Sequence, residues 1–170
     1  MRFATRRTRP NRLMTEPEVI RAEGVSLVPV PVGATLDTLD DLTGGRAIGR
    51  GWPHEDTGAG LAFMASGGWT WLITDAEGVI VGECGTKTPP DEGTVEIGYG
   101  LAAPSRGKGL GTRAVRALTD WLLALPDVHR VVAHVAADNV ASRRVVERLG
   151  FTVDRVEAGE VIYTRDRPGE

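Results

Sequence analysis

One short segment limits the possible folds of this chain more than any other. The β-forming run Thr94–Leu101 is followed, after four residues, by Arg106-Gly107-Lys108-Gly109-Leu110-Gly111-Thr112. From Leu110 onward, apolar residues recur at helical spacing as far as Leu125. A strand that leads through alternating glycines into a helix predicts an α/β fold with an anion site at the start of that helix.

The ligand that this segment suits is a pyrophosphate. Three alternating glycines let the backbone turn its N–H groups toward a ligand, and the helix start adds unpaired donors and partial positive charge. Arg106 and Lys108 would add full charges to the phosphate oxygens. Glycines that only form a tight turn remain the alternative when the segment is considered alone.

Two other glycine-rich phosphate motifs fit less well. A P-loop needs Gly-Lys followed by Ser or Thr, whereas Gly109 follows Lys108 here. The dinucleotide-binding pattern is formally met by Gly109, Gly111 and Ala114. Its acidic residue would come late, at Asp138, and half of the chain precedes the motif. The P-loop is therefore excluded, and a nicotinamide-binding protein is a distant alternative.

The rest of the chain alternates between strand-like and helix-like segments. Strands are expected over Val25–Val30, Trp69–Thr74, Val79–Lys87 and Arg130–Val135, and helices over Thr35–Leu42, Asp56–Ala65 and Asp138–Leu149. The turn Asp75-Ala76-Glu77-Gly78 predicts an antiparallel hairpin, and Gly150 a left-handed helix cap followed by an apolar contact from Phe151. A chain of 170 residues, 41% of them hydrophobic, predicts one α/β (α+β) domain over residues 14–170.

Charge divides the chain into a basic arm and an acidic body. Residues 1–13 carry five arginines and no acidic residue, so the net charge of -3 leaves -8 for the remainder. The arm is either disordered, an extension before a true start at Met14, or a nucleic-acid tail. The acidic body argues against broad nucleic-acid binding. No apolar run approaches the ~20 residues of a membrane span, and the arm lacks a secretory apolar stretch, so a soluble cytoplasmic protein is expected.

Metal and disulfide chemistry is not expected. Cys84 is the single cysteine, which excludes an intramolecular disulfide and a cysteine metal cluster. The histidines His54, His129 and His134 are too scattered for a helical zinc pair.

A family resemblance emerges from three motifs taken together. Arg106-x-x-Gly109-x-Gly111, followed by Asn139-x-x-Ser142-x-Arg144 and by Gly150-Phe151, resembles the GNAT superfamily of acyl-CoA-dependent N-acyltransferases. Three further segments resemble its RimJ/RimL-type branch of ribosomal-protein N-acetyltransferases and relatives: Glu96-Ile97-Gly98-Tyr99, Trp52-Pro53 and His129-Arg130-Val131. The strong part of the resemblance covers Thr94–Phe151.

The resemblance implies a three-layer fold and a coenzyme site. A mixed, mostly antiparallel sheet is expected, flanked by helices, whose central strands Thr94–Leu101 and Arg130–Val135 splay apart to admit the pantetheine of acetyl-CoA. The residues expected to bind coenzyme A are Leu101, Ala102, Ala103, Arg106, Gly107, Lys108, Gly109, Leu110, Gly111, Thr112, Asn139, Ser142 and Arg144. Asn139 can also act as a helix N-cap, and one side chain can fill both the capping and the coenzyme-binding role.

The implied reaction is direct transfer of an acetyl group to a primary amine of a protein N-terminus or a small molecule. Glu96 is predicted to take the proton from the amine, if its face of the strand points to the substrate. Ser142 is predicted as the acid for the leaving thiolate, because the helix lacks the tyrosine that many members carry there. Trp52 and Tyr99 are expected acceptor contacts. His54 and Glu55 join them in the loop before the second helix.

Several points stay open on the sequence. Gly100 stands where the branch commonly carries a bulky aromatic residue, which puts the acceptor pocket in question. The alternative function is a non-catalytic acyl-CoA-binding or sensing domain. The acceptor, the acyl group and the choice between monomer and homodimer are not determined.

Overall fold

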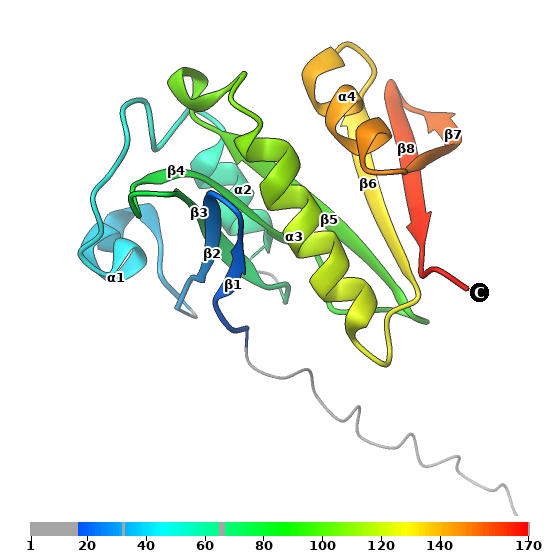
Figure 1. Cartoon of the computed structure of the whole chain (residues 1–170), viewed down its shortest axis with the longest axis horizontal. Helices are drawn as coiled ribbons and strands as arrows, with labels where there is room; N and C mark the ends of the chain where they lie inside the picture. The colour runs from blue at the N-terminus through cyan, green and yellow to red at the C-terminus, as the bar shows by residue number, and fades with distance from the viewer. Residues whose placement is uncertain (1–16, 32, 65–66, 170) are drawn as a thin grey trace, which may run out of the picture.

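The computed structural model of the chain describes residues 17–31, 33–64 and 67–169 (Figure 1). The predictions for the basic arm 1–13 and for a start at Met14 lie outside these residues. No helix in the described part of the chain has the length and apolar character needed to cross a bilayer.

A single eight-stranded sheet organises the described residues. Its strands, in chain order, are β1 (Ile20–Ala22), β2 (Val25–Pro29), β3 (Thr70–Asp75), β4 (Ile80–Thr86), β5 (Thr94–Leu101), β6 (Arg130–Ala136), β7 (Thr152–Glu157) and β8 (Glu160–Asp166). Their order across the sheet is β1-β2-β3-β4-β5-β6-β8-β7, and β5 and β6 pair in parallel while the other neighbours pair antiparallel. The predicted mixed, mostly antiparallel sheet is confirmed.

Helices cover both faces of the sheet, which gives the expected three layers. The helices are α1 (Leu39–Thr43), α2 (Thr57–Met64), α3 (Leu110–Ala124) and α4 (Val140–Arg148), with the 3-10 turns η1 (Leu36–Thr38) and η2 (Ala103–Ser105). Figure 1 shows α3 across one face and α2 behind the sheet. Strand alternation explains the two faces, since Trp71 and Ile73 join the α3 core whereas Leu72 joins a second cluster with Leu61 of α2.

The sequence expectations for individual elements hold in outline. The strand Thr94–Leu101 and the hairpin of β3 and β4 are confirmed. The helix expected over Thr35–Leu42 is instead a 3-10 turn followed by one short helix that ends at Gly44, whose φ is +59°. The strands β1, β7 and β8 were not predicted. β1 has three residues, and every residue of β7 is exposed, so neither carries an alternating burial pattern.

The two central strands separate halfway along their length. β5 pairs with β6 from Thr94 opposite Arg130 to Ile97 opposite Ala133. From Gly98 onward β5 pairs only with β4, and the end of β6 pairs only with β8. The predicted splay of these strands is therefore present and begins at Gly98.

Candidate active site

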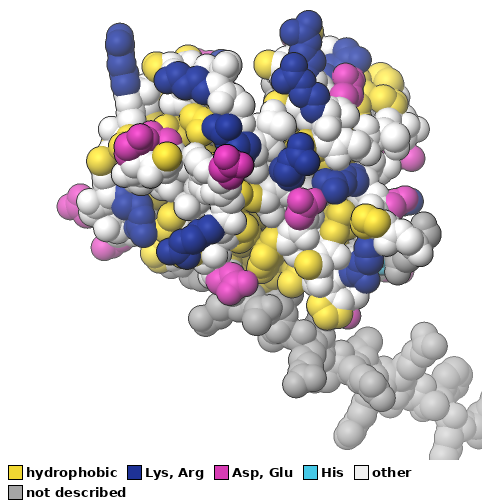
Figure 2. Space-filling model, in the orientation of Figure 1, with side chains coloured by type: hydrophobic (Ala, Val, Ile, Leu, Met, Phe, Trp, Pro, Cys, Tyr) yellow, Lys and Arg dark blue, Asp and Glu magenta, His cyan; other side chains and the backbone are white. Residues whose placement is uncertain are grey.

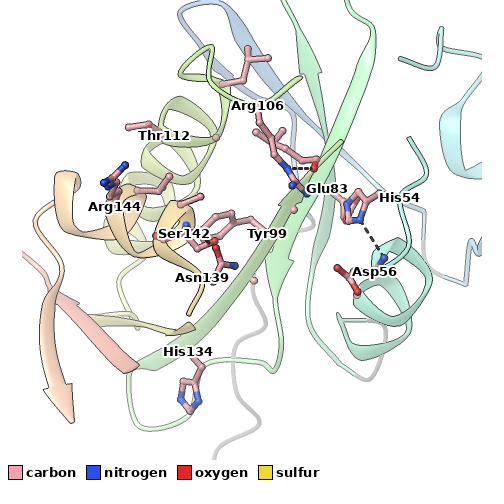
Figure 3. Close-up of a pocket in the computed structure, with 18 of the residues that line it drawn as sticks. His54, Asp56, Glu83, Tyr99, Arg106, Thr112, His134, Asn139, Ser142 and Arg144 are labelled. Atoms are coloured by element: carbon pink, nitrogen blue, oxygen red, sulfur yellow. Dashed lines mark hydrogen bonds and ion pairs between the residues drawn. The ribbon is translucent and has the colours of Figure 1, made fainter. Parts of the chain in front are cut away.

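A cavity of about 1060 Å³ lies where β5 and β6 part. Residues of the helices α2, α3 and α4 and of both central strands line it. Figure 3 shows Ser142, Asn139 and Arg144 on the side of α4, and Glu83, His54 and Asp56 on the opposite side. The cavity thus joins the predicted coenzyme segment to a second group of polar side chains.

The glycine turn forms one end of the cavity. Gly107 and Gly109 have φ of +76° and +75°, in the left-handed region that favours glycine, and Gly109 is the N-cap of α3. A Cβ at Gly111 would lie 3.1 Å from Leu101 Cδ1, so the glycine lets α3 start close against β5. The first residues of α3, Leu110, Gly111 and Thr112, line the cavity, and the first N–H groups of a helix have no partner within the helix.

Arginines surround the same end. Arg106, Arg144 and Arg148 line the cavity, and the Arg106 side chain is oriented by donation from Nε to the Leu101 carbonyl at 3.1 Å. Figure 2 shows the molecule hollowed beside the lobe that carries α4, with Lys and Arg side chains on both sides of the hollow. Helix-start donors and arginines together fit a pyrophosphate.

Not every predicted coenzyme residue reaches the cavity. Leu101, Arg106, Gly107, Gly109, Leu110, Gly111, Thr112, Asn139, Ser142 and Arg144 line it. Ala102 is fully buried, and Ala103 and Lys108 are exposed, outside the lining residues.

Tyr99 connects the two sides of the splay. Its hydroxyl donates to the Ser142 carbonyl at 3.1 Å, which links β5 to the first turn of α4. Burial raises the pKa of Tyr99, so the phenol stays protonated and keeps its donor role at neutral pH. Tyr99 lines the cavity, and its contact with an acceptor stays a prediction.

Asn139 caps α4 and lines the cavity at once. Its Oδ1 accepts from the Ser142 N–H at 3.1 Å, so the cap reading is confirmed, while a contact with the coenzyme stays a prediction. We expect Asn139→Ala to lower the free energy of unfolding by about 1 kcal/mol, because the cap acceptor is lost.

Asn139→Asp separates the two roles, since aspartate caps as well as asparagine. Urea unfolding should find this variant near wild-type stability, while a calorimetric titration with coenzyme A should find weaker binding if the side chain contacts the anionic coenzyme. An Ala variant as stable as the wild type would contradict the capping role.

Glu96, the predicted base, lies in an ion pair. Its Oε1 is 2.5 Å from Lys87 Nζ, and Lys87 rather than Glu96 is among the residues that line the cavity. The strand alternation puts Glu96 on the face of Gly98 and Gly100, toward α2 and away from the α3 core that holds Ile97. Whether it takes a proton from a substrate stays a prediction.

Glu83, the most buried acid of the cavity, was not predicted from the sequence. It lies in β4 and is 3% exposed. Its Oε2 accepts from the indole Nε1 of Trp52 at 2.7 Å and from the Thr57 hydroxyl at 3.3 Å. Its Oε1 lies 2.7 Å from His54 Nε2. Trp52, an expected acceptor contact, is thus buried behind the cavity and holds Glu83.

Burial has the largest influence on the pKa of the Glu83 carboxyl group. Desolvation raises the pKa of Glu83, and the contacts with Trp52, His54 and Thr57 oppose the rise only in part. A glutamate within the apolar stretch Ile80-Val81-Gly82-Glu83-Cys84 is the signal that could have identified it, since strands buried on both faces are usually apolar throughout.

Gly100 makes room for this pair. It lies opposite Glu83 across β4 and β5. A Cβ at residue 100 would come within 2.9 Å of His54 Nε2 and 3.0 Å of Glu83 Oε1. The residue that departs from the RimJ/RimL-type pattern is therefore the one against which His54 and Glu83 pack.

Comparison with known proteins agrees with this geometry. The family model described as an acetyltransferase (GNAT) domain matches residues 12–152. The uncharacterized N-acetyltransferase YjdG of Bacillus subtilis (strain 168) is 30% identical over 118 residues, which cover 63% of this chain and 70% of that protein.

Two solved structures share the fold. RimL, the ribosomal L7/L12 α-N-protein acetyltransferase in complex with coenzyme A, superposes with a TM-score of 0.63 at 18% identity, over 90% of this chain and 100% of that one. The aminoglycoside acetyltransferase AAC(6')-Ib in complex with coenzyme A has a TM-score of 0.55 at 24% identity, over 63% and 69% of the two chains. With the family model spanning the glycine turn, the splayed strands and the capped helix α4, the chain belongs to the GNAT acetyltransferase domain family.

Proposed function

We propose that this chain is an acetyl-CoA-dependent N-acetyltransferase that moves an acetyl group to a primary amine, on a protein N-terminus or a small molecule, by direct attack. The observation that carries the proposal is the distribution of charged side chains along one cavity. It runs from a glycine turn with three arginines to a buried carboxylate, across the gap between β5 and β6. The first end suits a polyanionic coenzyme and the second a cationic amine.

The coenzyme end is built from backbone donors and arginines. The helix-start N–H groups of Leu110, Gly111 and Thr112 would bind the pyrophosphate, with Arg106 and Arg144 supplying full charges. Bound acetyl-CoA supplies an activated thioester. The edge of β5 beyond Gly98, which has no partner on the β6 side, is available to bind the pantetheine arm as an added strand would.

The rest of the proposed mechanism requires two proton transfers, one from the amine and one to the leaving thiolate. An amine must lose a proton before its nitrogen attacks a thioester, and Glu96 is the predicted base. Ser142 lines the cavity and is the predicted donor to the leaving thiolate. The ordinary thiol pKa of about 8.5 makes departure without an acid feasible as well.

The finer classification belongs to the same proposal. The motifs around Glu96 and Trp52 support a place in the RimJ/RimL-type branch, and so does the fold match that spans the whole RimL chain. RimL and the aminoglycoside enzyme act on very different amines, so the fold leaves the acceptor open. A cytoplasmic location, the absence of nucleic-acid binding and a homodimer stay predictions from the sequence.

Thermal unfolding with separate additions of acetyl-CoA, coenzyme A and NAD tests the cofactor. At about 100 times its dissociation constant a ligand adds ~2.7 kcal/mol of stability. For a chain of this size that raises the midpoint by roughly 5–10 °C. We expect this rise with both coenzyme A species and none with NAD. No rise with acetyl-CoA would reject the glycine turn as a coenzyme site.

A panel of amines then separates an enzyme from a binding or sensing domain. The panel contains a peptide with a free α-amino group, an aminoglycoside and a polyamine, and release of the coenzyme A thiol is the readout. Transfer to any member supports the enzyme. Coenzyme binding with no transfer to any amine would favour the non-catalytic alternative.

A further inference from the structure

A buried carboxylate lines the cavity on the side away from α4 and is not one of the predicted coenzyme residues. Glu83 is 3% exposed, yet it is one of the residues that line the cavity. Its two oxygens have different surroundings. Oε2 faces the protein interior, where Trp52 and Thr57 donate to it, whereas Oε1 faces His54 and the bare strand at Gly100. Oε1 is therefore the oxygen next to the cavity.

His54 is fixed in one tautomer beside that oxygen. The Asp56 N–H donates to His54 Nδ1 at 3.3 Å, so the neutral imidazole carries its hydrogen on Nε2. Nε2 is the nitrogen that lies 2.7 Å from Glu83 Oε1. This contact is close, but Nε2 makes no hydrogen bond of good geometry among the described residues, so the imidazole packs against the carboxylate and leaves it as the group that accepts a further proton.

The charge of the cavity changes sign along its length. Arg144 and Arg148 line the cavity on the side of α4 and Arg106 at the glycine turn, while Glu83 and the exposed Asp56 lie on the side of α2; Lys87, which is paired with Glu96, also lines the cavity. Figure 3 shows Glu83, His54 and Asp56 grouped together, apart from Arg144. An acceptor that arrives as an ammonium ion would be attracted to the second end and repelled by the first.

We propose that Glu83 is the carboxylate that takes the proton from a cationic primary amine, with His54 as the residue that positions it. The inference rests on the N-acetyltransferase function proposed above. The ammonium gives one proton to Glu83, and its freed lone pair forms the C–N bond to the acetyl carbonyl carbon. The C–S bond breaks, the nitrogen loses its second proton to the coenzyme A thiolate, and Glu83 returns its proton to solvent.

Glu83 fits this role better than Glu96 on three observations. Lys87 already pairs with Glu96 at 2.5 Å, Glu96 is outside the lining residues, and among the described residues no Lys or Arg side chain forms an ion pair with Glu83. Burial also raises the pKa of Glu83 toward the range in which a carboxylate accepts protons efficiently at neutral pH.

Two amines of different basicity test the assignment. n-Butylamine is protonated near neutral pH and needs a base, whereas trifluoroethylamine is neutral there and does not. We expect Glu83→Gln to lower kcat/KM for n-butylamine by roughly 10²–10⁴-fold, the usual contribution of a general base. The loss with trifluoroethylamine should be far smaller. Glu77→Gln, in the exposed turn between β3 and β4, is the matched surface control.

The pH dependence distinguishes a chemical role from a structural one. The raised pKa of Glu83 places the acidic limb of kcat/KM for n-butylamine above the ordinary glutamate range, because only the ionised form accepts the proton. Other titratable groups lining the cavity are Asp56, Lys87, Tyr99, His134 and Glu160, with His54 in direct contact. Glu83→Gln should remove this limb, His54→Ala should shift it, and His54→Gln should restore part of the activity.

Gly100→Ala tests the geometry without removing a functional group. Its Cβ would press on His54 Nε2 and Glu83 Oε1, so it should reproduce the selective loss with n-butylamine while coenzyme A binding is retained. Equal losses with both amines in Glu83→Gln, or a selective loss in Glu96→Gln alone, would overturn the inference and leave the enzyme proposal standing. Transfer by the wild type neither to these two amines nor to any amine of the panel above would overturn both.

Discussion

Replacing Gly109 by valine is expected to abolish tight coenzyme A binding. Gly109 has φ of +75° at the start of α3, and a β-branched residue does not hold that conformation without strain. The turn would relax, and the first N–H groups of α3 would turn away from the cavity. Losing two hydrogen bonds to a charged phosphate, at ~1.5–3 kcal/mol each, lowers affinity by roughly 10²–10⁴-fold.

Calorimetric titration with coenzyme A measures this loss, and Gly78→Val is the matched control. Gly78 has φ of +80° in the turn between β3 and β4, outside the cavity, and a Cβ there would meet nothing within 4 Å. The control therefore carries comparable backbone strain and should lose stability while keeping wild-type affinity. If Gly109→Val bound coenzyme A as the wild type does, the backbone of this turn would not be the pyrophosphate site.

Truncating Trp71 to alanine is expected to cost about 3–5 kcal/mol of the free energy of unfolding. Trp71 is fully buried in β3, between the sheet and α3. Its ring makes edge contacts with Trp69 and Trp121, at centroid distances of 6.0 Å and 5.4 Å, and its Nε1 donates to the Glu18 carbonyl at 2.9 Å. The variant would leave a large cavity and remove the tie to the segment before β1.

Trp69→Ala is the comparison for this loss. Trp69 belongs to the same three-ring cluster but is only partly buried, so less apolar surface returns to water and the remaining side chains can close over the gap. Guanidinium unfolding of both variants should give a clearly larger loss for Trp71→Ala. Equal losses would mean that the cluster acts through its exposed rim rather than through the buried ring.

Much of the cavity wall that we predict to bind the coenzyme could be predicted from the sequence, because its features are local. The glycine turn, the start of α3 and the cap of α4 each depend on residues within a few positions of one another. Gly109 as a left-handed cap, Asn139 as the acceptor for Ser142, and Gly150 with φ of +81° all follow from short-range backbone chemistry. Ten of the thirteen predicted coenzyme residues accordingly line the cavity.

The part of the cavity near Glu83 was predicted less well, because its residues meet only across the sheet. Alternation along β5 places Glu96 on one face with Gly98 and Gly100, but it contains no information on the Lys87 ammonium that pairs with Glu96. Trp52 was expected at the substrate, yet its indole is buried and donates to Glu83 instead.

The sequence by itself determined the fold class, the glycine turn before α3 and the GNAT family, since each is encoded in contiguous segments whose periodicity or glycine pattern is visible in one dimension. Only the tertiary structure decided which carboxylate is buried beside the cavity. Glu83, His54 and Gly100 come from three separate segments, and the register of β4 against β5 brings them together. Burial and the spacing of such groups are properties of the packed sheet, and no local pattern in the chain carries them.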